Sequence, residues 1–487
     1  MVLGDFPPPP QPRNARRRAI LRLAVVVGLV SMSLALLSGT TGVLPGLRRQ
    51  AQTDSLPLRA DLIYRAGLAL QAAESTYNRP LGSAPENLIQ SGIAAYERAA
   101  LSETRNTQAT FRLAVIYARR GFPEQGVELL GSLVFLDEAN APLYMAVSGV
   151  YDPKTVETAQ LREAARVISD HPGWLTRLSL LDLYRRLGDR ERVEIIERQI
   201  ARGDALFAGI LGSVAGAYCL LVILGLVVLG VYLWRWLFHL PRPSRPSQST
   251  ASWGVFEALE AAAALLCAMT ILGSVAGLAA GRLTRTAIPT WAEALLTAGT
   301  YLLAFGVALL VMRHRMAAGR RGPLSALGLS RPPLMADARA GVLGYGVFVA
   351  LAVLAGALGG GLLGDLYLPP AQQSALDMLY HSQGAATYAI YLLLMCVIAP
   401  VLEETVFRGF IHSGLRSKLR PLPAIVAGSA LFGAYHMTLA LPAMAAVALV
   451  GALLAVLYER TGSLWPGILT HSLHNLLAFL VVLAVTR

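Results

Sequence analysis

The feature that most constrains the fold is a series of long apolar runs, each able to cross a lipid bilayer. The first run covers residues 19–37, and eight more follow at about 206–234, 255–280, 291–312, 340–363, 386–407, 422–438, 441–458 and 464–484. A helix needs roughly 20 apolar residues to cross about 30 Å of hydrocarbon. The sequence therefore predicts an all-α fold, a polytopic membrane helix bundle of about nine spans.

The distribution of charge excludes a nucleic-acid-binding protein. Only 15% of the residues are charged and the mean hydropathy is +0.52, whereas a soluble domain carries about 25% charged residues. The net charge is +12, yet residues 45–205 hold 20 basic and 20 acidic residues. The rest of the chain holds 22 basic and 10 acidic residues, so the whole excess flanks apolar runs. This pattern is typical of membrane topology rather than of a basic nucleic-acid surface.

The basic residues also orient the spans, because cytoplasmic loops are enriched in Lys and Arg. With the N-terminus in the cytoplasm, the predicted inner segments carry 19 basic residues and the short outer segments carry 3. We therefore expect a basic cytoplasmic tail at 1–18, a transmembrane anchor at 19–38 and an outer C-terminus. The first run lacks an A-x-A cleavage site, so we interpret it as an uncleaved anchor rather than a signal peptide. The Arg-rich composition and simple topology suit a bacterial inner membrane.

A soluble segment at 45–205 separates the anchor from the bundle at 206–487. Leu113 begins a helix–glycine–helix pattern that turns at Gly121, and Leu180 begins a second one that turns at Gly188. The two glycines are 67 residues apart, close to two periods of the 34-residue tetratricopeptide unit. The segment thus resembles a tetratricopeptide-like α-solenoid of three to four units, with a generic helical domain as the alternative. Either form offers a surface for a protein partner.

Two adjacent glutamates inside an apolar helix are the strongest sign of function. A charge at mid-bilayer costs roughly 2.5–3.5 kcal/mol on an insertion scale, so Glu403 and Glu404 need partners. Arg408 follows Glu404 by four residues, on the same helical face, and can neutralise it. Glu403 lies about 100° around the helix and remains available as a general base.

Two later apolar helices supply polar partners. His436 follows Phe432 in one helix, and the final apolar helix carries His471 and Asn475 on one face at i, i+4 spacing. Helical rise places His471 roughly 10 Å and His436 roughly 20 Å from the starts of their spans, so both can reach the glutamates. Two imidazoles and a carboxylate can hold zinc with an open position for water, and a glutamate–histidine pair can also activate water without metal. His412 and His474 are interpreted as structural.

These residues resemble a known family. Glu403-Glu404-x-x-x-Arg408, Phe432-x-x-x-His436 and His471-x-x-x-Asn475 occur in the order and helical setting of the CAAX-protease and bacteriocin-processing family of intramembrane endopeptidases. This family is also called the type II CAAX prenyl endopeptidase or Abi family. The resemblance covers about 340–487, with the motifs in 386–487, and it does not extend to the first 205 residues.

The resemblance implies a helix bundle around a peptidase site that opens to the cytosol. Glu403 would be the water-activating base and His436 would share the water or a metal. His471 and Asn475 would stabilise the oxyanion or complete metal binding, while Glu404 and Arg408 would orient the site. A zinc cofactor held by His436, His471 and Glu403 stays open beside a glutamate-dependent mechanism. In a bacterial host the expected substrate is a membrane-associated peptide or protein without a prenyl group.

Two other functions compete with the peptidase. The same fold can serve as a non-catalytic membrane scaffold or immunity protein, although every motif residue is retained. A transporter with Glu403 and His436 as a proton relay is the other alternative, but no inverted repeat is evident.

Overall fold

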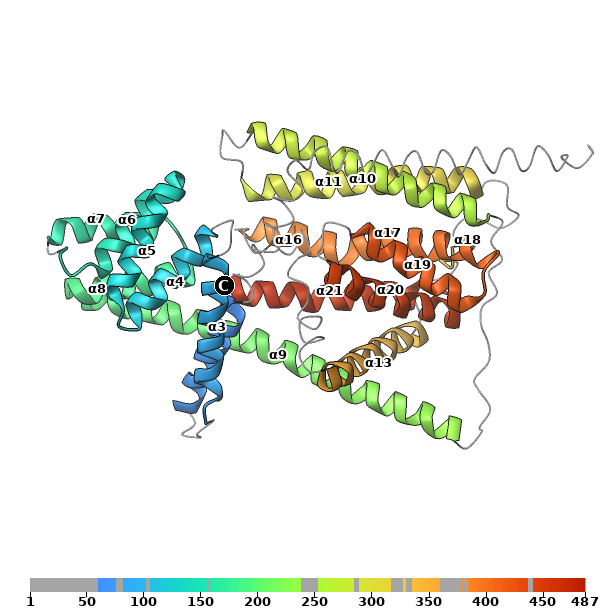
Figure 1. Cartoon of the computed structure of the whole chain (residues 1–487), viewed down its shortest axis with the longest axis horizontal. Coiled ribbons are helices and arrows are strands. Elements are labelled where there is room, and N and C mark those ends of the chain that lie inside the picture. Colours follow the sequence, from blue (N-terminus) through green and yellow to red (C-terminus); the bar gives the residue numbers. More distant parts are fainter. Residues whose placement is uncertain are drawn as a thin grey trace, which may run out of the picture. The chain divides into compact units, whose positions relative to one another are not determined.

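The computed structural model describes residues 60–75, 82–101, 106–155, 157–237, 253–283, 289–316, 327–329, 335–359, 379, 384–436 and 441–486. Every regular element among them is a helix, which confirms the all-α class (Figure 1). The predicted tail at 1–18 and anchor at 19–38 lie outside the described residues. The described residues divide into two compact units. One takes in residues 48–219 and 477–487, and the other 220–367 and 382–476.

The first unit is built from short helices that pack in succession, each against the next. After a helix over 60–75 come α3 (Ala84–Ala100), α4 (Thr107–Arg119), α5 (Pro123–Leu136), the 3₁₀ turn η1 (Glu138–Asn140), α6 (Ala141–Tyr151), α7 (Thr158–Ser169) and α8 (Trp174–Leu187). Their core includes the fully buried side chains Tyr96, Ile116, Leu130, Leu133, Ile168 and Leu183. The tetratricopeptide assignment itself stays a prediction.

Both predicted glycine turns occur in this unit. Gly121 has φ +95° between α4 and α5, and Gly188 has φ +68° between α8 and the next helix, α9. Residues other than glycine rarely adopt such backbone angles. Glycine therefore allows the chain to turn without strain after α4 and after α8. The helix–glycine–helix patterns in the sequence therefore correspond to real helical hairpins.

A single helix, α9 (Arg190–Leu237), crosses the expected domain boundary between residues 205 and 206. At 1.5 Å per residue its 48 residues extend about 72 Å, more than twice the thickness of the hydrocarbon core. The polar first turns and the apolar later turns thus belong to one continuous element. The change in hydropathy near residue 205 is a change of surroundings and not a break in the backbone.

The second unit contains most of the membrane helices, and α9 and α21 (Trp465–Thr486) each have residues in both units. Six described helices are long and apolar enough to cross a membrane: Arg190–Val231, Val255–Ala276, Thr290–Met316, Ala385–Arg416, Met444–Thr461 and Trp465–Thr486. They belong to α9, α10 (Val255–Leu283), α11 (Thr290–Met316), the helix from α16 to α18, α20 (Leu441–Thr461) and α21 (Trp465–Thr486). Two further apolar helices are α13 (Met335–Gly359) and the shorter α19 (Pro421–Tyr435). The protein is therefore integral to a membrane, while the count of nine spans stays a prediction.

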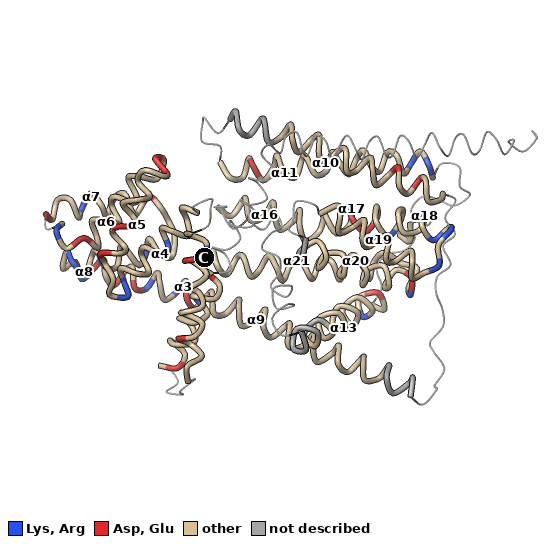
Figure 2. The backbone as a smooth tube through the Cα atoms, in the orientation of Figure 1, with Lys and Arg blue, Asp and Glu red and all other residues tan. Residues whose placement is uncertain are grey.

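Basic residues gather at one end of this helical unit (Figure 2). Arg313 and Arg315 lie in the last turn of α11, Arg416 ends α18, and Arg460 lies in the last turn of α20. These residues belong to three of the segments that the positive-inside rule assigns to the cytoplasm. Three of the predicted cytoplasmic segments thus share one end of the bundle in their described residues.

The far end of the last helix belongs to the same compact unit as the short helices. Arg65 donates hydrogen bonds to the carbonyl oxygens of Val485 (2.8 Å) and Ala484 (3.4 Å) near the end of α21. Its guanidinium also lies 4.3 Å from the ring centroid of Phe207 in α9. An arginine at a helix C-terminus satisfies carbonyls that have no partner within the helix. The soluble segment and the end of the last helix therefore belong to one compact unit, while the side of the membrane on which they lie stays a prediction.

Candidate active site

The two glutamates lie in a continuous helix that contains two π-helical stretches. It runs through α16 (Ala385–Leu393), η2 (Leu394–Ile398), α17 (Ala399–Glu404), η3 (Thr405–His412) and α18 (Ser413–Arg416), and both η2 and η3 are π-helical. Pro400 lacks an N–H group and so cannot donate the usual backbone hydrogen bond of the helix, and η2 ends two residues before it, at Ile398. π-Helical turns are rare and are frequent at functional sites. The glutamates thus sit where the helix departs from regular geometry.

Glu404 is fully buried and is neutralised by Arg408. Arg408 Nη1 lies 2.8 Å from Glu404 Oε1, and Nη2 donates to the Gly451 carbonyl at 3.0 Å. The guanidinium also packs over the ring of Phe432, 4.3 Å from its centroid. The i, i+4 spacing predicted this pair. The guanidinium is satisfied on three sides, so Arg408 holds Glu404 in one orientation.

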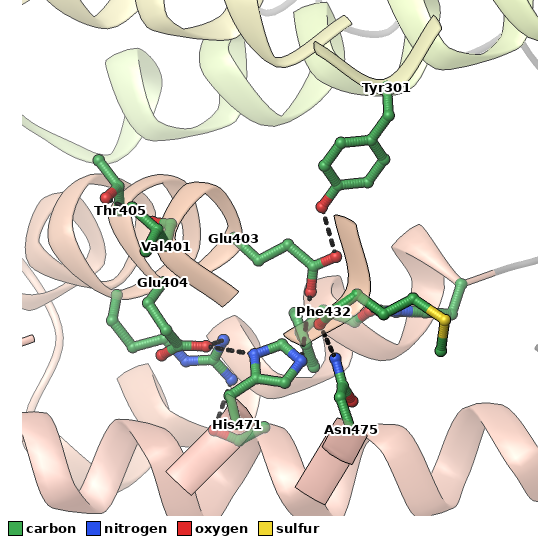
Figure 3. Close-up of polar contacts among 12 residues, drawn as sticks. Tyr301, Val401, Glu403, Glu404, Thr405, Phe432, His471 and Asn475 are labelled. Atoms are coloured by element: carbon green, nitrogen blue, oxygen red, sulfur yellow. Dashed lines mark hydrogen bonds and ion pairs between the residues drawn. The ribbon is translucent and has the colours of Figure 1, made fainter. Parts of the chain in front are cut away.

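Glu403 points away from this pair and toward two other helices (Figure 3). Its Oε1 accepts a hydrogen bond of 2.7 Å from the hydroxyl of Tyr301 in α11. Its Oε2 accepts no hydrogen bond among the described residues and lies 3.8 Å from His471 Nε2. The carboxylate is 5% exposed. One oxygen is therefore held in place, and the other is left available beside an imidazole.

His471 in α21 lies between the two carboxylates. Its Nδ1 is 3.2 Å from Glu404 Oε1, and its Nε2 faces Glu403. A carboxylate oxygen can only accept, so Nδ1 carries a proton in this contact. His471 is therefore the side chain that joins Glu403 and Glu404.

Asn475 lies one turn further along α21. Its amide nitrogen donates 2.8 Å to the carbonyl oxygen of Met395 in η2. The contact ties α21 to the π-helical stretch before the glutamates and leaves the second amide hydrogen of Asn475 for another acceptor. His471 and Asn475 therefore both face the glutamate helix, as their i, i+4 spacing predicted.

His436 follows the last residue of α19, and its direct contacts are aromatic. Its Nδ1 lies 2.9 Å from the Phe432 carbonyl, which can only accept, so Nδ1 carries the proton and Nε2 keeps a lone pair. Its ring centroid is 5.0 Å from that of Phe432, which in turn is 6.1 Å from His471. The structure thus brings Glu403, Glu404, Arg408 and His471 into direct contact, while His436 lies one aromatic ring away.

The arrangement bears on the predicted zinc ligands. Within the described residues, no three His, Cys, Asp or Glu side chains lie close enough together to hold a metal ion. Both nitrogens of His471 face carboxylates, and Nδ1 of His436 is engaged by a carbonyl. The residues in this arrangement do not form the three-ligand set of a catalytic zinc site.

Other ionisable groups in the bundle have structural partners. His412 and Arg416 both contact Glu459, at 2.8 and 2.5 Å. His474 lies 2.8 Å from the hydroxyl of Tyr345 in α13. The two histidines interpreted as structural, His412 and His474, thus bind residues of neighbouring helices and not Glu403 or Glu404.

Tyr301 is the residue at this site that the sequence analysis missed. It is 102 positions from Glu403 and lies in an apolar helix that carries no recognisable motif. The available signal was one tyrosine within an apolar helix, which also fits a tyrosine at a membrane interface.

Comparison with known proteins gives one match, which covers the site. Residues 385–477 match the family model described as type II CAAX prenyl endopeptidase Rce1-like. No curated protein and no solved structure matches the chain. The matched region includes both glutamates, both site histidines and Asn475, whereas Tyr301 lies outside it. Residues 385–477 form an Rce1-like domain of the type II CAAX prenyl endopeptidase family, and the activity of that family is intramembrane proteolysis.

Proposed function

We propose that the protein hydrolyses a peptide bond within the membrane by a water molecule that Glu403 activates. The observation that carries the proposal is that the two carboxylate oxygens of Glu403 have different surroundings. Oε1 is held by Tyr301, while Oε2 is buried, accepts no hydrogen bond among the described residues and lies beside His471. A buried acceptor without a donor is costly, and a water molecule both satisfies it and becomes the nucleophile.

The steps follow from the side chains at the site. Glu403 Oε2 takes one proton from water as the water oxygen attacks the scissile carbonyl carbon. The other hydrogen stays on that oxygen and donates a hydrogen bond to Nε2 of His436. The oxyanion receives hydrogen bonds from protonated His471 Nε2 and from the second amide hydrogen of Asn475. Collapse of the intermediate breaks the C–N bond, and Glu403 returns its proton to the leaving amine. A positioned base contributes about 10²–10⁴-fold and one oxyanion donor about 10²–10³-fold to the rate.

Glu404 and Arg408 have a supporting part in this proposal. Arg408 compensates one of the two adjacent carboxylates, so Glu403 and Glu404 are not left as a pair of like charges. Glu404 in turn orients the His471 ring through Nδ1. The pair therefore holds the oxyanion donor in place without contacting the substrate.

The substrate class and the location follow as part of the same proposal. The buried site suits a membrane-associated peptide, and a bacterial inner membrane with a cytoplasmic N-terminus agrees with the charge bias. The soluble segment lies with the far end of α21, so it serves a partner on the outer side rather than delivering substrate to an inner opening.

The experiment uses the full chain in phosphatidylethanolamine–phosphatidylglycerol liposomes. Two internally quenched peptides serve as probes, one ending in a farnesylated cysteine and three further residues, the other identical but without the farnesyl group. We expect wild-type cleavage, loss of cleavage in Glu403→Gln and His436→Ala, and wild-type cleavage in Glu459→Gln. Glu459 is the matched control, since it is a buried glutamate of the same domain that contacts His412 and Arg416.

Each arm of this experiment decides a separate question. Equal cleavage by wild type and Glu403→Gln contradicts the proposed role of Glu403. No cleavage by wild type favours a non-catalytic scaffold on the same fold. Preference for one peptide separates prenylated from unprenylated substrates. Loss of cleavage on chelation, restored by added zinc, assigns a metal to Glu403, His436 and His471, whereas insensitivity to the chelator leaves Glu403 as the sole activator.

A further inference from the structure

We propose that Tyr301 is a positioning residue of this site, which fixes the orientation of the Glu403 carboxylate from a helix outside the matched domain. The inference rests on the proposed function, in which Glu403 is the base. Its starting point is the hydrogen bond of 2.7 Å from the Tyr301 hydroxyl to Glu403 Oε1. Figure 3 shows Tyr301 reaching Glu403 from the side opposite His471 and Asn475.

The hydrogen bond makes the two carboxylate oxygens different. Oε1 is occupied by a donor, so rotation of the carboxylate would sacrifice that bond. Oε2 is thereby directed at His471 Nε2, 3.8 Å away, where the proposed water binds. Of the two carboxylate oxygens of Glu403, only Oε1 accepts a hydrogen bond from the described residues. Without the hydroxyl, neither oxygen of Glu403 is preferred for the water.

Tyr301 is itself held rigidly, as a positioning residue has to be. Its ring stacks on Phe305 at 4.6 Å between centroids, one turn further along α11. Phe305 is fully buried and meets Tyr435 edge-on at 6.0 Å, and Tyr435 lies 5.4 Å from Phe407 of the glutamate helix. The aromatic side chains thus link α11, α19 and η3. The hydroxyl is placed by packing on the same helices that carry Glu403 and His436.

Tyr301 lies outside the residues that match the family model. Residues 385–477 carry every motif residue, yet α11 at Thr290–Met316 lies outside that range. α11 packs against both α16 and η3, so it forms one wall of the site. The site is therefore complete only when residues 385–477 are combined with α11.

The test is Tyr301→Phe in the full chain, which removes one oxygen and keeps the ring. With the two quenched peptides in liposomes, we expect kcat to fall about 10- to 100-fold, the effect of a hydrogen bond to a charged group. We expect KM to stay within about twofold, because Tyr301 contacts Glu403 and not the substrate. Tyr458→Phe is the matched control. Its hydroxyl lies 3.2 Å from Ser413, away from the glutamates, and we expect wild-type kinetics.

The possible outcomes separate this inference from the proposed function. Wild-type kcat in Tyr301→Phe, with Glu403→Gln inactive, overturns the positioning role and leaves the base intact. A rise in KM at constant kcat also overturns it, since that result would place the hydroxyl on the substrate. Activity in Glu403→Gln removes the proposed function, and Tyr301 with it. A loss of activity that equals the loss of folded protein, with kcat per folded molecule unchanged, shows a merely structural role and overturns the inference as well.

Discussion

Replacing Arg408 with methionine tests how the membrane bundle tolerates two adjacent glutamates. Arg408 is 2% exposed and Glu404 is fully buried, and their charged groups are 2.8 Å apart. Arg408→Met leaves Glu404 as a buried charge without its counterion. Removing one partner of a buried ion pair lowers the free energy of unfolding by about 3–5 kcal/mol, because the remaining charge stays buried without its partner. The expected loss lowers the folded-to-unfolded ratio between about 100-fold and 4,000-fold.

A second substitution should recover much of that loss. Glu404→Gln removes the stranded charge, so the double variant Glu404→Gln/Arg408→Met buries no uncompensated carboxylate at this position. We expect it to be more stable than Arg408→Met alone. Arg408→Lys keeps the charge but cannot reach both Glu404 and the Gly451 carbonyl in the forked geometry of a guanidinium. Its loss should be smaller than that of Arg408→Met.

The assay is reversible unfolding of the full chain in mixed micelles of dodecyl maltoside and sodium dodecyl sulfate, followed by circular dichroism. Wild type, Glu404→Gln, Arg408→Met and the double variant form a double-mutant cycle, in which the coupling between Glu404 and Arg408 is the departure from additivity. We expect a favourable coupling above about 1 kcal/mol. Additive single losses, or an Arg408→Met loss below about 1 kcal/mol, would refute the view that Arg408 compensates a buried charge.

Three further predictions address other parts of the chain. Asn475→Ala leaves its carbonyl partner in η2 without this donor and should cost about 1–3 kcal/mol in the same unfolding assay, and no measurable loss would contradict the contact. Gly188→Ala should cost about 1–2 kcal/mol through its φ of +68°, whereas the helical control Gly131→Ala, with open space around it, should be neutral or stabilising. Burial and a hydrogen bond to Glu97 raise the pKa of Tyr117 from 10.0 to about 12. The stability that depends on its neutral phenol is complete below pH 10 and is lost as the pH rises through 12, so wild-type stability should fall more steeply there than that of Tyr117→Phe.

Local spacing was sufficient to predict the contacts that lie within one helix. The i, i+4 spacing placed Arg408 on Glu404, and the helix–glycine–helix patterns located the turns at Gly121 and Gly188. These predictions succeed because helical periodicity and left-handed backbone angles depend on a few neighbouring residues. The all-α membrane fold follows in the same way from the lengths of the apolar runs.

Contacts between distant helices were beyond local patterns. Tyr301 reaches Glu403 across 102 positions, and nothing in the residues around Tyr301 indicates which helix it faces. The π-helical stretches η2 and η3 depend on hydrogen-bond register, which composition does not reveal. The predicted boundary at residue 205 marked a change in hydropathy, whereas the backbone of α9 continues through it. Arrangement in space, rather than residue type, was the missing information in each case.

The most direct test of the central claim is a single-turnover cleavage in H₂¹⁸O with the product analysed by mass spectrometry. The wild-type protein and the Glu403→Gln variant, each in liposomes, are mixed separately with the quenched peptide, with the protein in excess over the peptide. The account predicts one ¹⁸O atom in the new carboxyl terminus of the wild-type product and no product from Glu403→Gln. A wild-type product without ¹⁸O, or equal product from the variant, would contradict hydrolysis by a water molecule activated at Glu403.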